Sequence, residues 1–158
     1  MSGNVTPTIR PATRDDAGEI HALHTRSITT LCAEVYSNEM IAALLKDRTL
    51  EGYHDSIDKG DMFVCSIDDK IVGFLHAVPG EVVAVFVDAG RDGQGIGSVL
   101  FRRALEIAAR GHEGPIKLVS TLNAEGFYAK HGFVPVKKST VSRNEVEIPV
   151  VEMELRSV

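Results

Sequence analysis

The chain has 158 residues, 44% of them hydrophobic and 25% charged, so it is long enough to form one domain with a substantial core. Its formal charge of −5 disfavours a nucleic-acid partner, whose phosphates it would repel, and is compatible with neutral or cationic small molecules. No apolar run approaches the roughly 18 residues of a membrane span, and the polar start lacks a signal-peptide pattern. We therefore expect a cytoplasmic protein without membrane contact.

The potential metal ligands and thiols follow no recognised pattern. Cys32 and Cys65 match neither a zinc nor a redox spacing, and we expect buried, reduced thiols, with a disulfide left open. The six histidines include no suitably spaced pair, so the sequence predicts no metal site.

The first half of the chain predicts a strand, three helices and an antiparallel meander. Pro11 suits an edge strand, and Thr13 and Ser37 suit helix caps. The predicted strands are Thr8–Ala12, Met62–Ile67, Lys70–Val78 and Glu81–Val87, and two of the predicted helices are Asp15–Leu31 and Thr49–Lys59, with a further helix starting after Ser37.

The second half predicts helices alternating with strands. The helices are Gly95–Arg110 and Ala124–Lys130, and the strands are Ile116–Leu122, Phe133–Val141 and Ile148–Leu155. The crossover from Glu81–Val87 to Ile116–Leu122 should be right-handed, which makes those two strands parallel. The pattern is that of an α+β, or mixed α/β, chain, and we expect residues 1–158 to form a single domain around one sheet.

A glycine-rich turn, Gly93-Gln94-Gly95-Ile96-Gly97, separates a predicted strand from a predicted long helix. The first N–H groups of a helix lack internal partners, and glycines let a bulky anion approach them closely. A tight turn needs fewer glycines, so the turn predicts a site for a diphosphate. The lysine of a P-loop is absent, and Leu100 occupies the third glycine position of a dinucleotide-binding motif.

Two motifs resemble those of the GCN5-related N-acetyltransferase (GNAT) superfamily. The first is the strand, glycine turn and helix, in which Asp92 stands where the family usually has Arg or Gln, and Arg91 lies one place early. The second, Leu122-Asn123-Ala124-Glu125-Gly126-Phe127-Tyr128 with Gly132-Phe133 after it, is similar to the family's second conserved segment. The resemblance extends over nearly the whole chain and is weakest between Ser27 and Gly60.

The resemblance implies a GNAT-like fold with a central mixed, mostly antiparallel sheet of about six to seven strands and helices on both faces. It also implies that acetyl-CoA lies in a V-shaped opening between the strands that end at Val87 and Leu122, with an amide near Phe86 polarising the thioester carbonyl. The residues implied in cofactor binding are Val85, Phe86, Val87, Asp92, Gly93, Gln94, Gly95, Ile96, Gly97, Ser98 and Asn123.

Catalysis implied by the resemblance needs an acid and a base. Tyr128 would protonate the departing thiolate. An alkylamine with a pKa near 10.4 is neutral only to the order of 0.1% at pH 7, so a base must help to remove its proton. Glu81 is the first candidate base. Its rivals are His76, His54 and Glu34, and Glu34 and Tyr36 could also contact the acceptor.

The predicted partner is a small-molecule amine or a peptide amine. The sequence leaves open whether the protein is a monomer or a homodimer. Acylation of a hydroxyl, and a coenzyme-A-binding regulatory module without transferase activity, are alternative functions.

Overall fold

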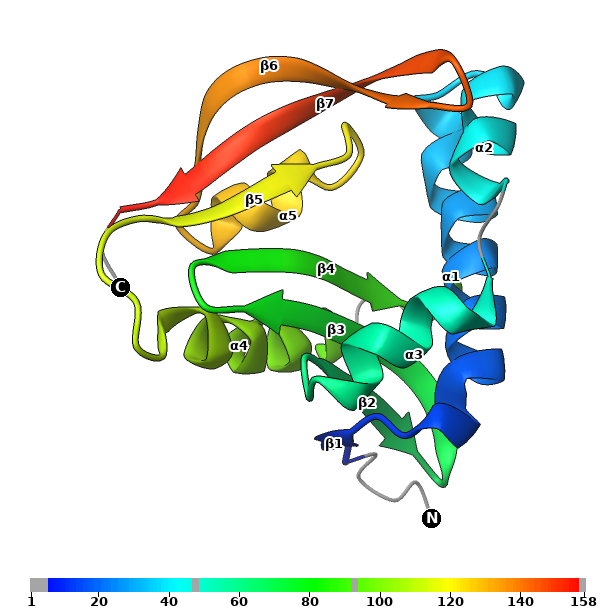
Figure 1. Cartoon of the computed structure of the whole chain (residues 1–158), viewed down its shortest axis with the longest axis vertical. Coiled ribbons are helices and arrows are strands. Elements are labelled where there is room, and N and C mark those ends of the chain that lie inside the picture. Colours follow the sequence, from blue (N-terminus) through cyan, green and yellow to red (C-terminus); the bar gives the residue numbers. More distant parts are fainter. Residues whose placement is uncertain (1–5, 47–48, 92–93, 157–158) are drawn as a thin grey trace.

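The computed structural model describes residues 6–46, 49–91 and 94–156 (Figure 1). In chain order, the strands and α-helices of these residues are β1 (Thr8–Pro11), α1 (Ala17–Leu31), α2 (Asn38–Leu45), α3 (Leu50–Asp58), β2 (Met62–Ile67), β3 (Lys70–Val78), β4 (Glu81–Val87), α4 (Ile96–Ala109), β5 (Ile116–Ser120), α5 (Glu125–Lys130), β6 (Val134–Arg143) and β7 (Val146–Leu155).

The strands join in one seven-stranded sheet with the order β1-β2-β3-β4-β5-β7-β6. Every neighbouring pair is antiparallel except β4 and β5, which are parallel and joined through α4. The expected mixed, mostly antiparallel sheet and the parallel crossover are thus confirmed.

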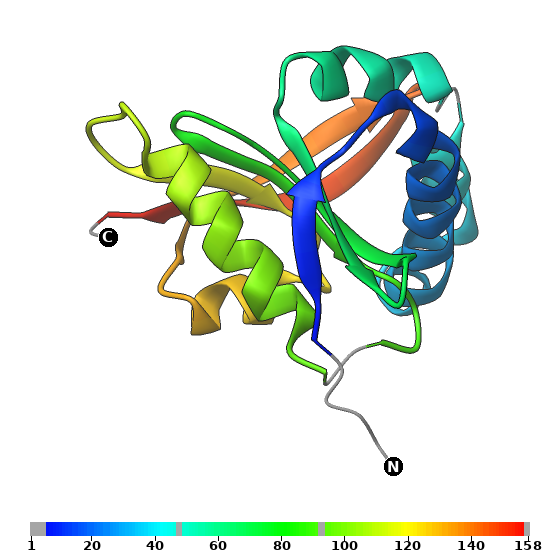
Figure 2. The ribbon, with the colours of Figure 1, turned by 90° about the horizontal axis from the view of Figure 1, so that it is seen from below.

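Helices cover both faces of the sheet (Figure 2). On one face, α4 packs through Leu100, Phe101 and Ala104 into a core that also takes in Tyr128 from α5. On the other face, α1 and α3 bury Ile20, Leu23, Tyr53 and Ile57 against β2 and β3. A third cluster joins the end of α1 and α2 to β7. Of the helices in the described residues, none is both long and apolar enough to cross a bilayer.

The predicted element bounds hold within a few residues, with two informative differences. The first predicted helix begins with one 3-10 turn, Arg14–Asp16, before α1. The strand predicted to reach Leu122 ends at Ser120, because the Leu122 N–H donates to the Tyr36 hydroxyl at 3.0 Å instead of to a strand. Ser37 caps α2 as expected, its hydroxyl accepting from the Met40 N–H.

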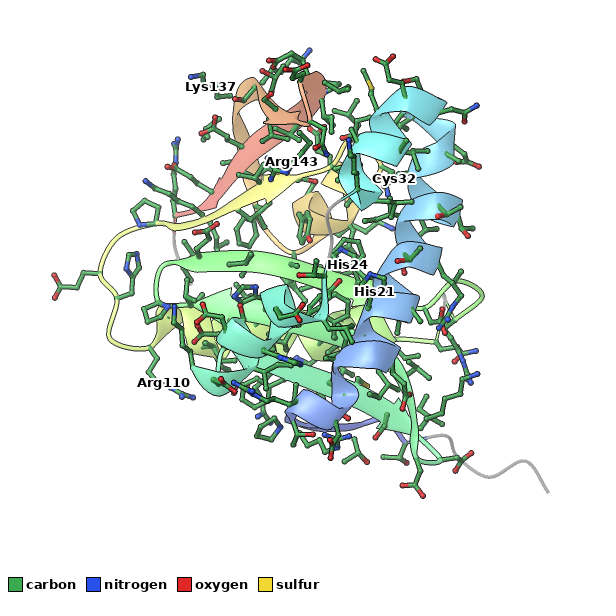
Figure 3. All side chains as sticks on the ribbon, turned by 45° about the vertical axis from the view of Figure 1, so that its right-hand side comes forward. His21, His24, Cys32, Arg110, Lys137 and Arg143 are labelled. Atoms are coloured by element: carbon green, nitrogen blue, oxygen red, sulfur yellow. The ribbon has the colours of Figure 1, made fainter. Side chains whose placement is uncertain are left out.

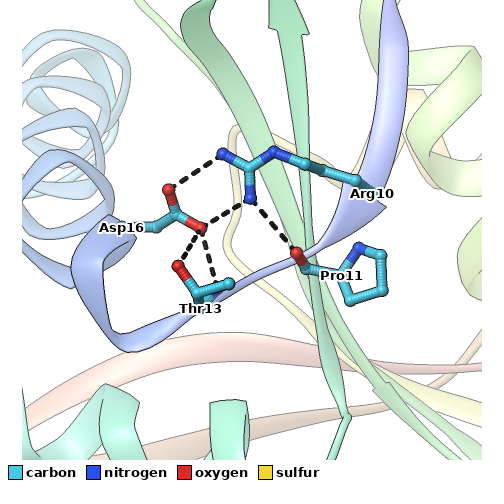
Figure 4. A network of polar contacts seen from close by, with 4 residues as sticks. All are labelled: Arg10, Pro11, Thr13 and Asp16. Atoms are coloured by element: carbon cyan, nitrogen blue, oxygen red, sulfur yellow. Dashed lines mark hydrogen bonds and ion pairs between the residues drawn. The ribbon is translucent and has the colours of Figure 1, made fainter.

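A buried carboxylate ties the edge strand β1 to the start of α1 (Figure 4). Asp16 accepts two hydrogen bonds from the Arg10 guanidinium, at 2.8 and 2.9 Å, and one from the Thr13 N–H at 2.7 Å. The Arg10 hydrogen bonds are the main reason that the pKa of Asp16 lies below its usual range. This network fixes the start of the first helix beside the edge of the sheet.

Candidate active site

Strands β4 and β5 pair only at their beginnings and then diverge in a V (Figure 1), and we call the space between the two diverging strand backbones the opening. Their one pairing position is Glu81 with Lys117. Beyond it, the edge of β4 has no strand partner on the β5 side. The opening predicted between the ends of these two strands is therefore present.

The register of β4 on β3 decides which backbone groups face this opening. Asp88 donates its N–H to the Val72 carbonyl at 2.8 Å. Backbone groups alternate between the two edges of a strand, so Phe86 also turns its N–H and C=O toward β3, where Phe74 is its partner. Val85 and Val87 turn theirs toward the opening, and the Val87 carbonyl accepts from the Ser27 hydroxyl at 2.9 Å.

A β-bulge interrupts β4 next to the opening. His76 pairs with Ala84 and Ala77 pairs with Val82, so Val83 is an extra residue without a partner on β3. Val83 is 40% exposed and lines a cavity between α1, α3 and the sheet. The bulge thus brings Val83 to the wall of that cavity.

Helix α4 begins beside the open edge of β4, and the amides of its first turn have no hydrogen-bond partner among the described residues. Gly95 is its N-cap with a φ of +78°, no described side chain caps the helix, and no acidic residue lies in its first turn. A cavity of about 340 Å³ adjoins this start and is lined by Val87, Arg91, Gly95, Ile96, Gly97, Ser98 and Phe127. A Cβ at Gly97 would lie 3.2 Å from the Phe127 ring, so the close packing of α5 on α4 also requires a glycine here.

This cavity gathers five of the predicted cofactor residues, Val87, Gly95, Ile96, Gly97 and Ser98. Asp92 and Gly93 lie outside the described residues. Gln94 lines a neighbouring small cavity together with Arg91. Arg91 was noted only as a displaced motif residue, yet it is the cation that lines the cavity at the start of α4. The sequence feature that could have identified Arg91 is its position one residue before the place where the family motif usually has Arg or Gln.

Tyr128 on α5 is buried, with 7% of its surface exposed. Its ring packs edge-on against Phe101 and Phe127. Burial raises the pKa of Tyr128 to about 12. Its hydroxyl has no hydrogen-bond partner among residues 6–46, 49–91 and 94–156. A buried hydroxyl in this state is costly unless a ligand completes it.

Asn123 and Tyr36 make hydrogen bonds on the β5 side of the opening. The Asn123 side-chain oxygen accepts from the Cys32 thiol at 3.5 Å. The Tyr36 hydroxyl donates to the Pro149 carbonyl at 2.7 Å while it accepts from the Leu122 N–H. Tyr36 was predicted as a possible acceptor contact. In the structure its hydroxyl links the segment after α1 to the end of β5 and to β7.

A second cavity, of about 430 Å³, lies between α1, α3 and the sheet, and we call it the acceptor cavity. It reaches the β4 bulge, and Thr121 after β5 is at its border. Its lining residues are His24, Ile28, Cys32, Leu44, Thr49, Gly52, Tyr53, Ser56, Met62, Phe74, His76, Val83, Ala84, Phe86 and Thr121. His54 and Glu34, two of the rival bases, are not among them.

Two histidines line the acceptor cavity. His24 lies on the side of α1 that faces the sheet (Figure 3), with its Nδ1 3.0 Å from the Tyr53 hydroxyl and its ring centroid 4.3 Å from that of Phe86. Burial lowers the pKa of His76 below its ordinary 6.5, against the opposing charges of Asp61 and Glu81. The imidazole of His76 makes no hydrogen bond to the described residues. A neutral, unpartnered imidazole therefore adjoins the bulge.

Glu81 lies at the closed end of the V, where β4 and β5 pair. It is exposed and lines a separate cavity with His112 and Lys117 rather than the acceptor cavity. Its charge nevertheless acts on His76. No cluster of three or more metal-ligating side chains occurs in the ranges that the structure describes.

An open strand edge that leads to a helix N-terminus can hold an extended ligand that ends in an anionic group. Residues 32–157 match the acetyltransferase (GNAT) domain family, and the chain belongs to that family. It is therefore an acyltransferase enzyme of the N-acetyltransferase class.

Individual relatives are distant. The chain is 23% identical over 126 residues to the uncharacterized N-acetyltransferase YafP of Escherichia coli K12, covering 80% of each. A GCN5-related N-acetyltransferase structure from Rhodopseudomonas palustris superposes with a TM-score of 0.81 at 24% identity, over 99% of this chain and 100% of that one. The PaiA N-acetyltransferase of Thermoplasma acidophilum, solved with coenzyme A, gives 0.77 at 19% identity, over 96% and 99%.

Proposed function

We propose that this protein transfers the acetyl group of acetyl-CoA to an amine held in the acceptor cavity. The observation that carries the proposal is a pair of cavities that are both lined by residues of β4: one lies at the start of α4, and the other lies at the bulge of β4. The first fits a diphosphate, and the second has room for an acceptor.

The chain's own groups suit acetyl-CoA along the whole opening. The amides of Gly95, Ile96, Gly97 and Ser98 would hold the diphosphate, and Arg91 adds a positive charge there. Backbone groups of Val85 and Val87 would pair with the pantetheine arm as a strand does. Asn123 would hydrogen-bond the same arm, and its oxygen is already oriented by Cys32. Asp92, Gly93 and Gln94 stay predicted contacts.

The amide that polarises the thioester carbonyl is assigned to Val85. We expected it near Phe86, but the register gives the Phe86 backbone to β3. The Val85 N–H faces the opening one residue away and is free to donate.

Acetyl-CoA supplies an activated acyl group, and protein side chains move the protons. His76 accepts a proton from the amine as its nitrogen attacks the acetyl carbon. Tyr128 donates its proton to the sulfur as the carbon–sulfur bond breaks, and the products are the N-acetyl amine and free coenzyme A. Glu81 lies at the closed end of the V and supports the charge on His76, so we prefer His76 as the base.

The coenzyme-A-binding module without transferase activity remains the second candidate. The acceptor cavity with an unpartnered imidazole favours transfer, because a pure binder needs neither. Detection of acetylated product separates the two functions, and a hydroxyl acceptor would appear in the same assay as an ester.

Substitution of Gly95 tests the cofactor site. Gly95→Val places a β-branched residue at a φ of +78° beside the free amides, and we expect coenzyme A affinity measured by titration calorimetry to fall at least tenfold. Gly111→Val is the matched control, because Gly111 has a φ of +66° and lies beyond the other end of α4. Wild-type affinity in a folded Gly95→Val variant would refute the diphosphate site.

The setting in which the enzyme acts is also a proposal. Cys32 and Cys65 are buried and unpaired, which supports the expected reducing, cytoplasmic compartment. All seven strands join one sheet, which supports a single acetyltransferase domain over residues 1–158. A homodimer stays open, and the exposed Val119 on β5 and Val134 and Val136 on β6 are apolar residues that one would cover.

A further inference from the structure

Among the described residues that line the acceptor cavity, none is Asp, Glu, Lys or Arg. Their polar groups are hydroxyls, one thiol and two imidazoles, and burial keeps the imidazole of His76 mainly neutral at pH 7. A ligand carrying a charge in addition to its reacting amine would therefore find no carboxylate, ammonium or guanidinium partner among these described residues.

Aromatic rings form one side of the cavity. Phe74 and Phe86 stack with ring centroids 5.5 Å apart, His24 lies against both, and Tyr53 closes the side formed by α3. Ile28, Leu44 and Met62 add aliphatic surface. Such walls bind an apolar body through its removal from water. The ring faces also attract an alkylammonium group before it loses its proton.

The ends of the cavity orient such a ligand. His76 and the bulge residue Val83 lie where the opening between β4 and β5 begins, so the nitrogen must point there to react. The apolar body then extends toward the rings of α1, α3 and β3. The protein's net charge of −5 draws cations toward it over a longer range without binding a second charge inside.

We propose that the acceptor is a primary monoamine with an uncharged, apolar or aromatic body, and that the cavity discriminates against amino acids and polyamines. This inference rests on the proposed function, since it names the acceptor of the same site. A carboxylate or a second ammonium group would be desolvated without a partner, which disfavours its binding. A peptide would likewise leave backbone groups unpaired against the apolar walls.

Matched pairs of acceptors test the proposal. Phenethylamine is compared with phenylalanine, which adds only a carboxylate, and hexylamine with hexamethylenediamine, which adds only a second amine. A tripeptide with a free N-terminus is the fifth acceptor. With saturating acetyl-CoA, we expect each monoamine to exceed its charged partner and the peptide at least tenfold in kcat/KM. A preference for the amino acid, the diamine or the peptide would overturn the proposal.

A charge introduced into the wall gives the converse test. Ser56 on α3 lines the cavity and is partly exposed. Ser56→Asp should raise the ratio of hexamethylenediamine to hexylamine turnover at least fivefold, whereas the neutral, equally large Ser56→Asn should leave that ratio close to the wild-type value. An unchanged ratio in Ser56→Asp would contradict the assignment of this cavity to the acceptor.

Different results would contradict the proposed function and the proposed acceptor class. If no acceptor yields product while coenzyme A binds, the proposed function itself fails. If amines are acetylated but the charged members of the pairs are preferred, the enzyme stands and the acceptor class is wrong. Calorimetric titration of hexylamine and hexamethylenediamine into the protein measures the preference without turnover, and tighter binding of the diamine would also count against the proposal.

Discussion

The Tyr128 hydroxyl is buried and has no hydrogen-bond partner in the described part of the chain. In the proposed mechanism this hydroxyl protonates the sulfur of acetyl-CoA as coenzyme A leaves. We expect Tyr128→Phe to lower turnover at least tenfold while coenzyme A affinity changes little. Because the removed hydroxyl bonds nothing, the free energy of unfolding should stay within about 0.5 kcal/mol of the wild type.

Turnover and urea unfolding measured on the same Tyr128→Phe preparation separate catalysis from structure. Unchanged turnover would exclude Tyr128 from the mechanism. A large loss of stability would show instead that the hydroxyl supports the core.

The pH profile of kcat depends on whether His76 or Glu81 is the general base. The folded-state pKa of His76 lies below 6.5, so the imidazole is neutral and accepts protons at pH 7, and kcat should fall as the pH decreases through that lowered pKa. His76→Gln should lower kcat about a hundredfold and remove this acidic limb. The measurement is kcat against pH with an amine acceptor.

Glu81→Gln is the control that distinguishes the two candidate bases. The Glu81 charge raises the pKa of His76, so its removal should move the acidic limb to lower pH and retain the maximal kcat. A collapse of kcat in Glu81→Gln, with His76→Gln active, would return the base to Glu81.

At the scale of elements, the opening depends on a tyrosine that joins three segments. Tyr36 follows α1, accepts from the Leu122 N–H after β5 and donates to the Pro149 carbonyl in β7. Tyr36→Phe keeps the ring but leaves both backbone groups unpaired. We expect the free energy of unfolding to fall by about 2 kcal/mol and coenzyme A binding to weaken several-fold, because Asn123 adjoins Leu122.

Urea unfolding and calorimetry measure the two effects. Tyr53→Phe is the matched control: it removes one hydrogen bond to His24 in the acceptor cavity and should leave coenzyme A affinity unchanged. Equal losses of coenzyme A affinity in both variants would contradict the role of Tyr36 at the opening.

Element prediction succeeded where local patterns decide structure. The meander follows from tight turns and alternation, and α4 from its apolar stripe and flanking glycines. The end of β5 was predicted too late because the β-branched Thr121 and the apolar Leu122 are both compatible with a strand, although the neighbouring β4 has diverged. The bulge at Val83 has no local signature, since Val82 and Val83 are both ordinary strand residues.

On the scale of the whole molecule, the two cavities lie on either side of one open strand. The cavity at the start of α4 is made by a single local motif and by Phe127. The acceptor cavity combines residues from α1, α3, β3 and β4, with α2 at its border. Residues so far apart in the chain meet only because the helices of the first half cover the face of the sheet opposite α4 (Figure 2).

The amino-acid sequence by itself determined the order of the elements and the family, and it predicted the diphosphate site, because each of these depends on contiguous residues with a distinctive spacing. Only the tertiary structure decided which side chains line the acceptor cavity. It placed Glu81 at the closed end of the V and His76 in the cavity, because the pairing register and the bulge, rather than the residue types, determine which positions of β3 and β4 face the ligand.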